Sequence, residues 1–185
     1  MRINAIFKWN NHMELWDLYD RDGNLTDQVW ERKHGHNDEI PEGLYHLVSD
    51  ILVQHTDGTY LLTKRDMRKD ICPGLWEPSA GGSAKQGEGP EECAVRELFE
   101  ETGLKADSME FINKTVSDKN RSIYYSYLAV VNCDKDSVVL QEGETTEYKW
   151  VDKKGLLEYT KSELAMKKHV ERYREFFDRL FADIS

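Results

Sequence analysis

The segment from Gly82 to Leu104 places the tightest constraint on the fold of this chain. It begins as a loop rich in glycine and small residues, and the pattern from about Pro90 to Thr102 predicts a helix. Pro90 suits the first helical turn, where its missing N–H has no intrahelical partner to lose, and Gly103 suits the turn that ends a helix. We therefore expect a loop that leads directly into a helix with a defined start and end.

The charges on this helix point to its chemistry. Glu97, Glu100 and Glu101 lie three and four residues apart, so a helix puts them on one face. They repel one another, and the last two also oppose the helix dipole. A divalent cation would remove both penalties, because Mg²⁺ takes carboxylate oxygens as ligands. The alternative is a solvated acidic face, whose repulsion Arg96 partly relieves. Three apolar residues are expected to point the other way, toward a core: Val95, Leu98 and Phe99.

The surrounding pattern favours the metal site over the solvated face. It resembles the Nudix box, Gly-x5-Glu-x7-Arg-Glu-U-x-Glu-Glu-x-Gly-U, in which U is a bulky aliphatic residue. Every specified position of this box is filled here: Gly82, Glu88, Arg96, Glu97, Leu98, Glu100, Glu101, Gly103 and Leu104. A match at so many fixed spacings is far more specific than a lone glycine-rich loop.

The resemblance implies a fold, a cofactor and a reaction. The fold is α/β, a Nudix-type α/β/α sandwich with a mixed β-sheet, and the cofactor is Mg²⁺ or Mn²⁺. Glu88 would assist through water or a salt bridge, and Arg96 would orient the glutamates. The reaction is metal-assisted hydrolysis of a phosphoanhydride bond in a nucleoside di- or triphosphate, or in a nucleoside diphosphate linked to another group. The implied metal ligands are three side chains and one backbone carbonyl: Glu97, Glu100, Glu101 and Gly81.

A carboxylate must also accept the proton of the attacking water. Glu144 is the first candidate, because it precedes Trp150 by six residues in a loop that resembles the acidic loop of these enzymes. Glu97 is the alternative base. An ordinary loop acid is the competing interpretation of Glu144.

Outside the box, residues 14–160 resemble the Nudix branch that contains isopentenyl-diphosphate isomerases, so double-bond migration is the alternative function. Gly81 stands where the isomerase has its catalytic cysteine, and Ser83 stands where it has a metal-binding histidine. The catalytic glutamate of its later strand has no clear counterpart in residues 122–131. His46 alone matches an isomerase metal histidine, and we interpret it as structural or substrate-side. These departures favour hydrolysis.

Two basic residues align with those that hold the isomerase's diphosphate. Arg65 and Lys69 are therefore candidate substrate-binding residues, since arginine binds phosphate oxygens in pairs. The competing interpretation is an exposed basic loop. A third hypothesis, a nucleotide sensor without catalysis, is disfavoured because such domains tend to lose box glutamates and this chain keeps them.

Composition limits the partners. The net charge of −10 argues against a nucleic-acid partner, and no apolar run is long enough to span a bilayer. Three widely spaced cysteines make neither a disulfide framework nor a zinc pattern, so a reducing cytoplasm is the expected compartment. The expected partner is a small-molecule diphosphate. The N-terminal hairpin is the candidate surface for a homodimer.

The remaining pattern predicts a single Nudix domain over residues 1–185. Its parts are an N-terminal extension and hairpin (1–35), a core (36–160) and a C-terminal helix (161–183), and Met13 is a candidate natural start. That helix is expected to begin at the capping box Thr160-Lys161-Ser162-Glu163 and to bury an apolar stripe. Residues 65–87 are expected to be loop with at most one short strand. The expected stripe residues are Met166, Val170, Tyr173, Phe177 and Leu180. Strands are expected at residues 14–19, 28–31, 45–54, 60–63, 108–116, 122–131 and 147–151.

Overall fold

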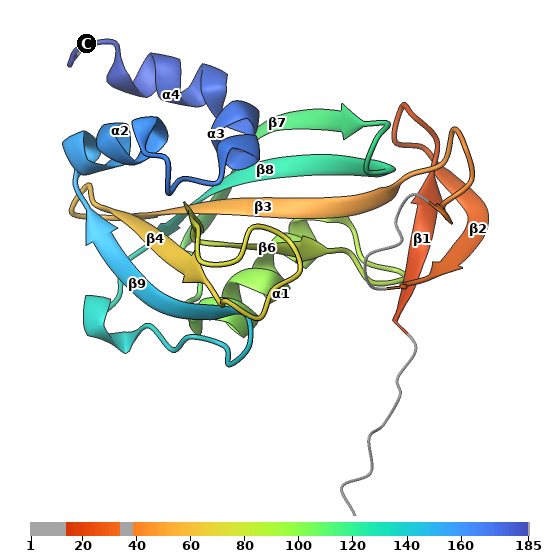
Figure 1. Cartoon of the computed structure of the whole chain (residues 1–185), viewed down its shortest axis with the longest axis horizontal. Coiled ribbons are helices and arrows are strands. Elements are labelled where there is room, and N and C mark those ends of the chain that lie inside the picture. Colours follow the sequence, from red (N-terminus) through yellow and green to blue (C-terminus); the bar gives the residue numbers. More distant parts are fainter. Residues whose placement is uncertain (1–13, 34–38, 185) are drawn as a thin grey trace, which may run out of the picture.

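The computed structural model describes residues 14–33 and 39–184, so the candidate start Met13 lies outside it (Figure 1). Four helices are described: α1 (Pro90–Thr102), α2 (Lys153–Lys161), α3 (Lys167–Arg172) and α4 (Arg174–Phe181). A 3-10 turn, η2, covers Lys135–Ser137. The strands are β1 (Leu15–Tyr19), β2 (Leu25–Glu31), β3 (His46–His55), β4 (Tyr60–Arg65), β5 (Trp76–Pro78), β6 (Ala80–Ser83), β7 (Ser108–Ser117), β8 (Ser122–Val131) and β9 (Thr145–Val151).

A mixed sheet forms the centre of the molecule. Its strands run in the order β5-β4-β3-β8-β7, and β6 also pairs with β3 while β9 pairs with β4. The β3–β8 pair is parallel and the other pairs are antiparallel. Strand β3 is buried along most of its length, as expected for a strand that is covered on both faces.

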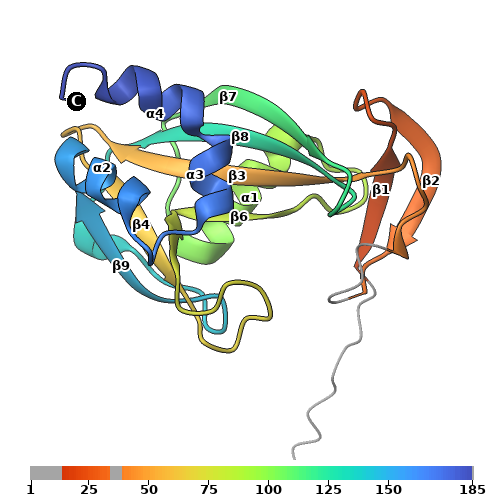
Figure 2. The ribbon, with the colours of Figure 1, turned by 45° about the horizontal axis from the view of Figure 1, so that its top comes forward.

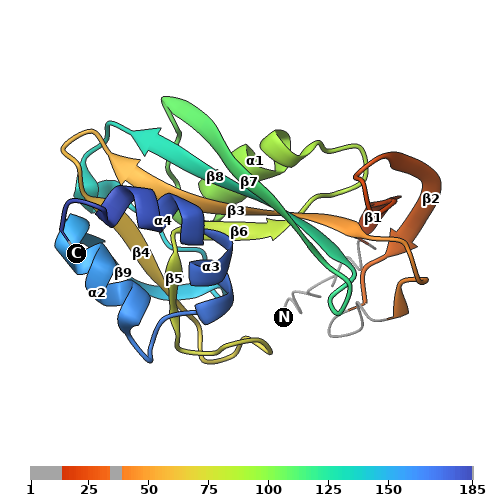
Figure 3. The same cartoon turned by 90° about the horizontal axis from the view of Figure 1, so that it is seen from above.

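The two faces of this sheet bury different helices. Ile51 and Val53 of β3 pack in one cluster with Leu98 of α1, whereas Leu52 packs on the other face with Tyr173. Alternate side chains of a strand point to opposite faces, so one strand supports both layers. Figure 3 shows α2, α3 and α4 on the face opposite to α1. This arrangement confirms the expected α/β/α sandwich. None of the described helices has the length and apolarity needed to span a membrane.

The N-terminal hairpin forms a separate two-stranded sheet at one end of the molecule (Figure 2). Its turn contains Gly23, whose φ of 89° suits glycine. Backbone hydrogen bonds in both directions between Tyr19 and Tyr45, of 2.8 and 2.9 Å, join it to the core. The hairpin prediction is confirmed, although β2 begins at Leu25 and not at Gln28.

Two short strands occupy the segment that we expected to be mostly loop. Strands β5 and β6 pair with β4 and β3, respectively. Between them, Ser79 accepts a hydrogen bond from Val53 N at 2.8 Å and donates one to Leu61 O at 2.9 Å. These strands are too short to show an alternating apolar pattern, so the neighbouring strands determine their conformation.

The expected single C-terminal helix is wrong. Helix α2 begins earlier, where Asp152 accepts a hydrogen bond from Gly155 N at 2.7 Å, and the expected capping box falls at its end. The chain then bonds to Trp76 of β5 through Leu164 O and Met166 N, both at 2.8 Å, which requires it to leave the helix. Helices α3 and α4 follow. The core interpretation of the stripe is confirmed: Met166, Tyr173 and Phe177 are buried, and Val170 and Leu180 are partly buried.

The inward face of α1 also differs from the expectation. Leu98 is buried, but Val95 and Phe99 are 53% and 52% exposed. Ala94, Leu98 and Glu101 form the buried stripe instead. The buried stripe is rotated relative to the expected one, because Glu101 points toward the sheet together with the apolar residues.

A buried ion pair fixes α3 against the sheet. Asp50, in the middle of β3, accepts hydrogen bonds from Nε and Nη2 of Arg172, the latter at 3.1 Å, and both side chains are buried. We predict that Arg172→Met lowers the free energy of unfolding by about 3–5 kcal/mol, because it leaves a buried carboxylate uncompensated. Urea unfolding measures this change. The exposed neighbour Arg174→Met should change it by less than about 0.5 kcal/mol. Equal losses in both variants would contradict the ion-pair account.

Candidate active site

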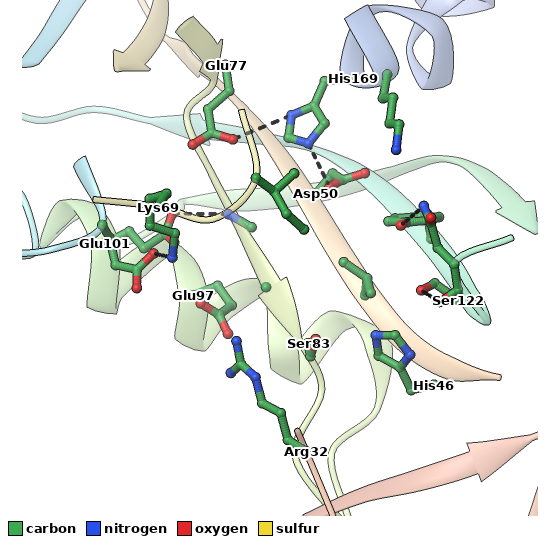
Figure 4. A pocket seen from close by; sticks show the side chains of 18 of the residues that line it. Arg32, His46, Asp50, Lys69, Glu77, Ser83, Glu97, Glu101, Ser122 and His169 are labelled. Atoms are coloured by element: carbon green, nitrogen blue, oxygen red, sulfur yellow. Dashed lines mark hydrogen bonds and ion pairs between the residues drawn. The ribbon is translucent and has the colours of Figure 1, made fainter. Parts of the chain in front are cut away.

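A cavity of about 560 Å³ is lined by residues of α3 and by the acidic end of α1. Eight of its lining residues are acidic. Five of these form an acidic wall from α1, β5 and the loop before β9: Glu77, Glu97, Glu100, Glu101 and Glu144. Figure 4 shows Glu97 and Glu101 on one side and His169 and His46 on the other. The cavity therefore has an acidic wall that faces two histidines.

Helix α1 positions the acidic wall through both of its ends. At its start, the Glu92 side chain accepts a hydrogen bond from Gly89 N at 2.9 Å, and Ser49 of β3 donates one to Pro90 O at 2.6 Å. At its end, Gly103 adopts a left-handed φ of 70°, and its N–H bonds to Phe99 O at 2.9 Å. The predicted helix and its end are confirmed, and Glu97, Glu100 and Glu101 lie in its last two turns.

Arg96 holds three box glutamates together. Its Nε and Nη2 donate to the two carboxylate oxygens of Glu88 at 2.6 and 2.7 Å. Its Nη1 donates to Glu97 at 2.6 Å and to Glu100 at 3.1 Å, and Nη2 also donates to Ser83 O at 3.1 Å. The hydrogen bonds from Arg96 are the main reason that the pKa of Glu88 is lowered. The bonds to the glutamates also raise the pKa of Arg96, although burial opposes this rise.

Burial raises the pKa values of three other carboxylates at the cavity, those of Glu77, Glu97 and Glu101. Glu101 is 7% exposed, and burial first, then Glu77 and Glu97, raise its pKa well above the usual value. Burial raises the pKa of Glu77 to about 7, although its partner Arg65 opposes this change, and burial also raises the pKa of Glu97. The acidic wall therefore holds negative charge at an electrostatic cost that a cation would remove.

This donor set fits Mg²⁺ or Mn²⁺, because hard oxygen ligands surround a partly dehydrated position. Glu101 Oε2 accepts from Gly81 N at 3.1 Å, so the predicted carbonyl ligand and this glutamate are adjacent. Among the described residues, no three aspartate, glutamate, histidine or cysteine side chains are already arranged to hold a metal ion. Arg96 binds Glu97 and Glu100 instead, so a bound ion would draw at least one of these carboxylates away from Arg96.

The other predicted residues come from segments outside α1. Lys69 and Glu144 form an ion pair, and both line the cavity. Arg65 also lines it, but Nη1 donates to both oxygens of Glu77 at 3.0 and 3.1 Å, and Nε donates to Ile71 O at 3.0 Å. The structure thus brings every predicted site residue to the cavity or its edge, with Glu88 reaching it through Arg96.

Sequence reasoning missed a buried polar chain beneath the cavity, formed by Asp50, Glu77, His169 and Arg172. His169 Nε2 lies 3.6 Å from Asp50 Oδ1 and its Nδ1 lies 3.9 Å from Glu77 Oε2, so neither makes a hydrogen bond. Burial lowers the pKa of His169 to about 3, so this imidazole is neutral. One signal was available in the sequence: an aspartate inside an otherwise buried strand requires a partner.

The N-terminal hairpin closes the end of the cavity farthest from the acidic wall. Trp16 of β1 stacks on His46 with ring centroids 4.1 Å apart and an interplanar angle of 11°. The hairpin also contacts the loop that precedes α1: Gln86 N donates to Leu15 O and Gly87 N donates to Asp17 Oδ2, both at 2.7 Å. The hairpin therefore contributes to the same cavity as the box.

Comparison with known proteins places this fold and site in one family. A family model described as the NUDIX domain matches residues 44–180, about three-quarters of the chain. This chain therefore belongs to the Nudix hydrolase family.

Individual relatives and structures agree with this assignment. A Nudix hydrolase of Listeria monocytogenes is 35% identical over 95 residues, 51% of this chain and 54% of that protein. An isopentenyl-diphosphate Delta-isomerase of Photorhabdus laumondii is 31% identical over 122 residues, 64% of this chain and 68% of that protein. The chain thus spans about half the length of the curated relatives it matches first.

Solved structures share the fold at low sequence identity. The protein DR0079 of Deinococcus radiodurans has a TM-score of 0.64 and 18% identity, over 82% of this chain and 91% of that one. The NUDIX domain of Shewanella oneidensis NrtR, solved with ADP-ribose, has a TM-score of 0.57 and 20% identity, over 74% and 88%.

The raised pKa of Glu101 predicts how stability depends on pH and metal. Between the ordinary value of 4.5 and its higher folded value, the folded state binds more protons than the unfolded state, so stability falls as pH rises through this window. Without metal at pH 8, Glu101→Gln should melt at a higher temperature than wild type, and this difference should shrink toward pH 4.5.

Thermal unfolding by circular dichroism, with and without 10 mM Mg²⁺ (roughly a saturating excess), measures both effects. Mg²⁺ should raise the melting temperature of wild type but not of Glu101→Gln. The exposed helix residue Glu91 offers a control, and Glu91→Gln should behave as wild type. If Mg²⁺ leaves the wild-type melting temperature unchanged at pH 8, this account is refuted.

Proposed function

We propose that this protein hydrolyses a phosphoanhydride bond in a nucleoside diphosphate derivative with the help of Mg²⁺ or Mn²⁺. The observation that carries this proposal is the complete Nudix box, whose glutamates line one cavity. The NrtR domain, a structural neighbour, was solved with ADP-ribose, which is a nucleoside diphosphate linked to another group. The fold alone does not specify the reaction, so the site residues carry the argument.

The proposed roles of the box follow from its contacts. Glu97, Glu100 and Glu101 would hold the ion together with the Gly81 carbonyl, and Arg96 would guide the glutamates between itself and the ion. Glu88 would keep Arg96 in place, because its bidentate contact to Nε and Nη2 does not involve the other carboxylates. A bound ion would neutralise the diphosphate oxygens and lower the pKa of a water molecule.

Glu144 is the proposed general base. It is partly buried at the cavity wall, and Lys69 holds its carboxylate. A general base must lie within reach of the attacking water, and Glu144 lines the cavity into which the water would enter. Glu97 is the alternative base, but its carboxylate already accepts a hydrogen bond from Arg96.

Lys69 and Arg65 are the proposed phosphate contacts. The Lys69 side chain is 24% exposed and its partner Glu144 is 33% exposed, so substrate phosphate can compete for the ammonium. Arg65 forms an ion pair with the buried Glu77, so it would contact phosphate without breaking this ion pair. We further propose that the chain acts as one Nudix domain, since the hairpin and α3 line the same cavity as the box.

Isomerisation is the second candidate, because the isomerase relatives are similar over more than half of this chain. The backbone at Gly81 opposes it. A Cβ at this position would lie 2.8 Å from the backbone oxygen of Ser49. The cysteine that the isomerase resemblance requires at this position therefore does not fit without a shift of β3 or β6.

We predict that Glu100→Gln and Glu101→Gln each lower kcat/KM by on the order of 10²-fold or more, because a metal ion stabilises the transition state by several kcal/mol. Glu144→Gln should lower kcat by about 10²–10⁴-fold with little change in Mg²⁺ affinity. The assay is release of phosphate or of a nucleoside monophosphate from a panel of nucleoside diphosphate derivatives. Glu91→Gln is the matched control on the same helix. Full activity in Glu101→Gln would sink the proposed metal site.

The isomerase alternative has its own test. We predict no detectable conversion of isopentenyl diphosphate to its double-bond isomer, since Gly81 has no side chain that can transfer a proton. The measurement is product analysis by mass spectrometry after acid treatment, in the presence of Mg²⁺ and Mn²⁺. Robust isomerisation, together with no hydrolysis of any nucleotide, would reverse the choice between the two functions.

A further inference from the structure

His46 lines the end of the cavity away from the acidic wall, and its environment fixes its chemical state. The residue is 1% exposed, and Trp16 of the hairpin stacks on its ring. Its Nδ1 lies 3.0 Å from the carbonyl oxygen of Arg121. A carbonyl only accepts hydrogen bonds, so Nδ1 carries the ring proton and Nε2 carries the lone pair.

The imidazole of His46 is therefore a hydrogen-bond acceptor at the cavity. Burial lowers its pKa to about 4, so the ring stays neutral at physiological pH. Among the residues that the structure describes, none donates a hydrogen bond to Nε2, and Figure 4 shows the ring directed into the pocket. This nitrogen can therefore accept a hydrogen bond from a molecule that enters the cavity.

The position of His46 along β3 indicates which part of a substrate reaches it. Asp50 pairs in register with Gly81, next to the acidic wall. His46 precedes Asp50 by four residues on the same strand. At about 3.3 Å per residue, the two positions are about 13 Å apart, which is more than a diphosphate spans. The group at His46 is therefore the organic part of a diphosphate substrate.

We propose that His46 Nε2 accepts a hydrogen bond from a hydroxyl or amino group of the substrate's organic part, and so selects a nucleoside over a prenyl group. A nucleoside carries such donors on its ribose and base, whereas a prenyl chain carries none. The hairpin takes part in this selection, because Trp16 holds the ring and is itself held by Glu14, which accepts from Trp16 Nε1 at 3.0 Å. This inference rests on the proposed hydrolysis of a nucleoside diphosphate derivative.

Two variants test the roles of the two ring nitrogens of His46 independently. The amide of asparagine reaches the place of Nδ1, so His46→Asn keeps the bond to the Arg121 carbonyl and loses the acceptor in the cavity. The amide of glutamine reaches the place of Nε2, so His46→Gln keeps that acceptor and loses the Arg121 bond. A merely structural histidine would suffer more from His46→Gln than from His46→Asn, and the thermal midpoint of each variant reports this loss.

The probes are ligands that the enzyme does not cleave: the α,β-methylene analogues of ADP, CDP, GDP and UDP, and methylenediphosphonate, which lacks a nucleoside. Dissociation constants are measured by calorimetry with Mg²⁺. We expect wild type to bind at least one nucleoside analogue about tenfold or more tightly than methylenediphosphonate. His46→Asn should lose about tenfold of this preference, and His46→Gln should stay within about threefold, because one hydrogen bond is at stake. Methylenediphosphonate itself should bind all three proteins equally.

The proposal is overturned if His46→Asn keeps the wild-type preference, if both ligand classes weaken equally, or if wild type prefers no nucleoside analogue. Isopentenyl diphosphate serves as a further probe, and sensitivity of its binding to His46→Asn would also overturn the proposal. The proposed function fails by a separate result, namely that the wild-type protein cleaves no nucleoside diphosphate derivative. The binding comparison does not depend on turnover, so the two failures are distinguishable.

Discussion

The crowding of carboxylates at the end of α1 is the constraint on which the rest of the site depends. Glu101 is buried against the sheet, Glu97 and Glu77 lie near enough to raise its pKa, and desolvation raises the pKa values of all three. A fold keeps such an arrangement only if something balances it. Two arginines balance part of the charge, since Arg96 binds Glu97 and Arg65 binds Glu77. Within residues 14–33 and 39–184, the N–H of Gly81 is the one group that donates a hydrogen bond to the Glu101 carboxylate. The remaining charge is what a divalent ion would neutralise, so the electrostatic cost of the site would also be the source of the proposed metal affinity.

The architecture brings the site together from distant parts of the chain. Strand β3 carries Asp50 toward α3 and pairs with β6, whose glycines run beside α1. A side chain at Gly82 would collide with the Glu97 carboxylate, so glycine at this box position leaves room for the glutamate. The hairpin adds the far wall of the cavity through the Trp16–His46 stack. Because the family match begins at residue 44, Trp16 lies outside the part of the chain that the family model covers, whereas His46 lies inside it.

The sequence predicted the elements whose signals are local. Helix α1, its end at Gly103 and the contacts of Arg96 with the box glutamates follow from spacing within a short segment, and they are confirmed. Features that depend on distant partners were not predictable in the same way. Asp50 and Arg172 are 122 positions apart, and nothing local indicates that they pair. The capping box at Thr160 gave a wrong helix start for two reasons. Asp152 already starts a helix earlier, and the hydrogen bonds to β5 keep the segment after it from being helical. Phe99 is exposed because Glu101 takes the inward position, which a hydrophobic pattern does not anticipate.

The most direct test of the central claim is an anomalous-difference map from a crystal grown with Mn²⁺ and a non-hydrolysable nucleoside diphosphate analogue. The account predicts a peak at the acidic wall, within metal-ligand distance of Glu101 and the Gly81 carbonyl, with Glu97 or Glu100 turned away from Arg96 toward it. A map without a peak at the acidic wall, with Arg96 still holding both glutamates, would contradict the claim that these carboxylates exist to bind a metal ion.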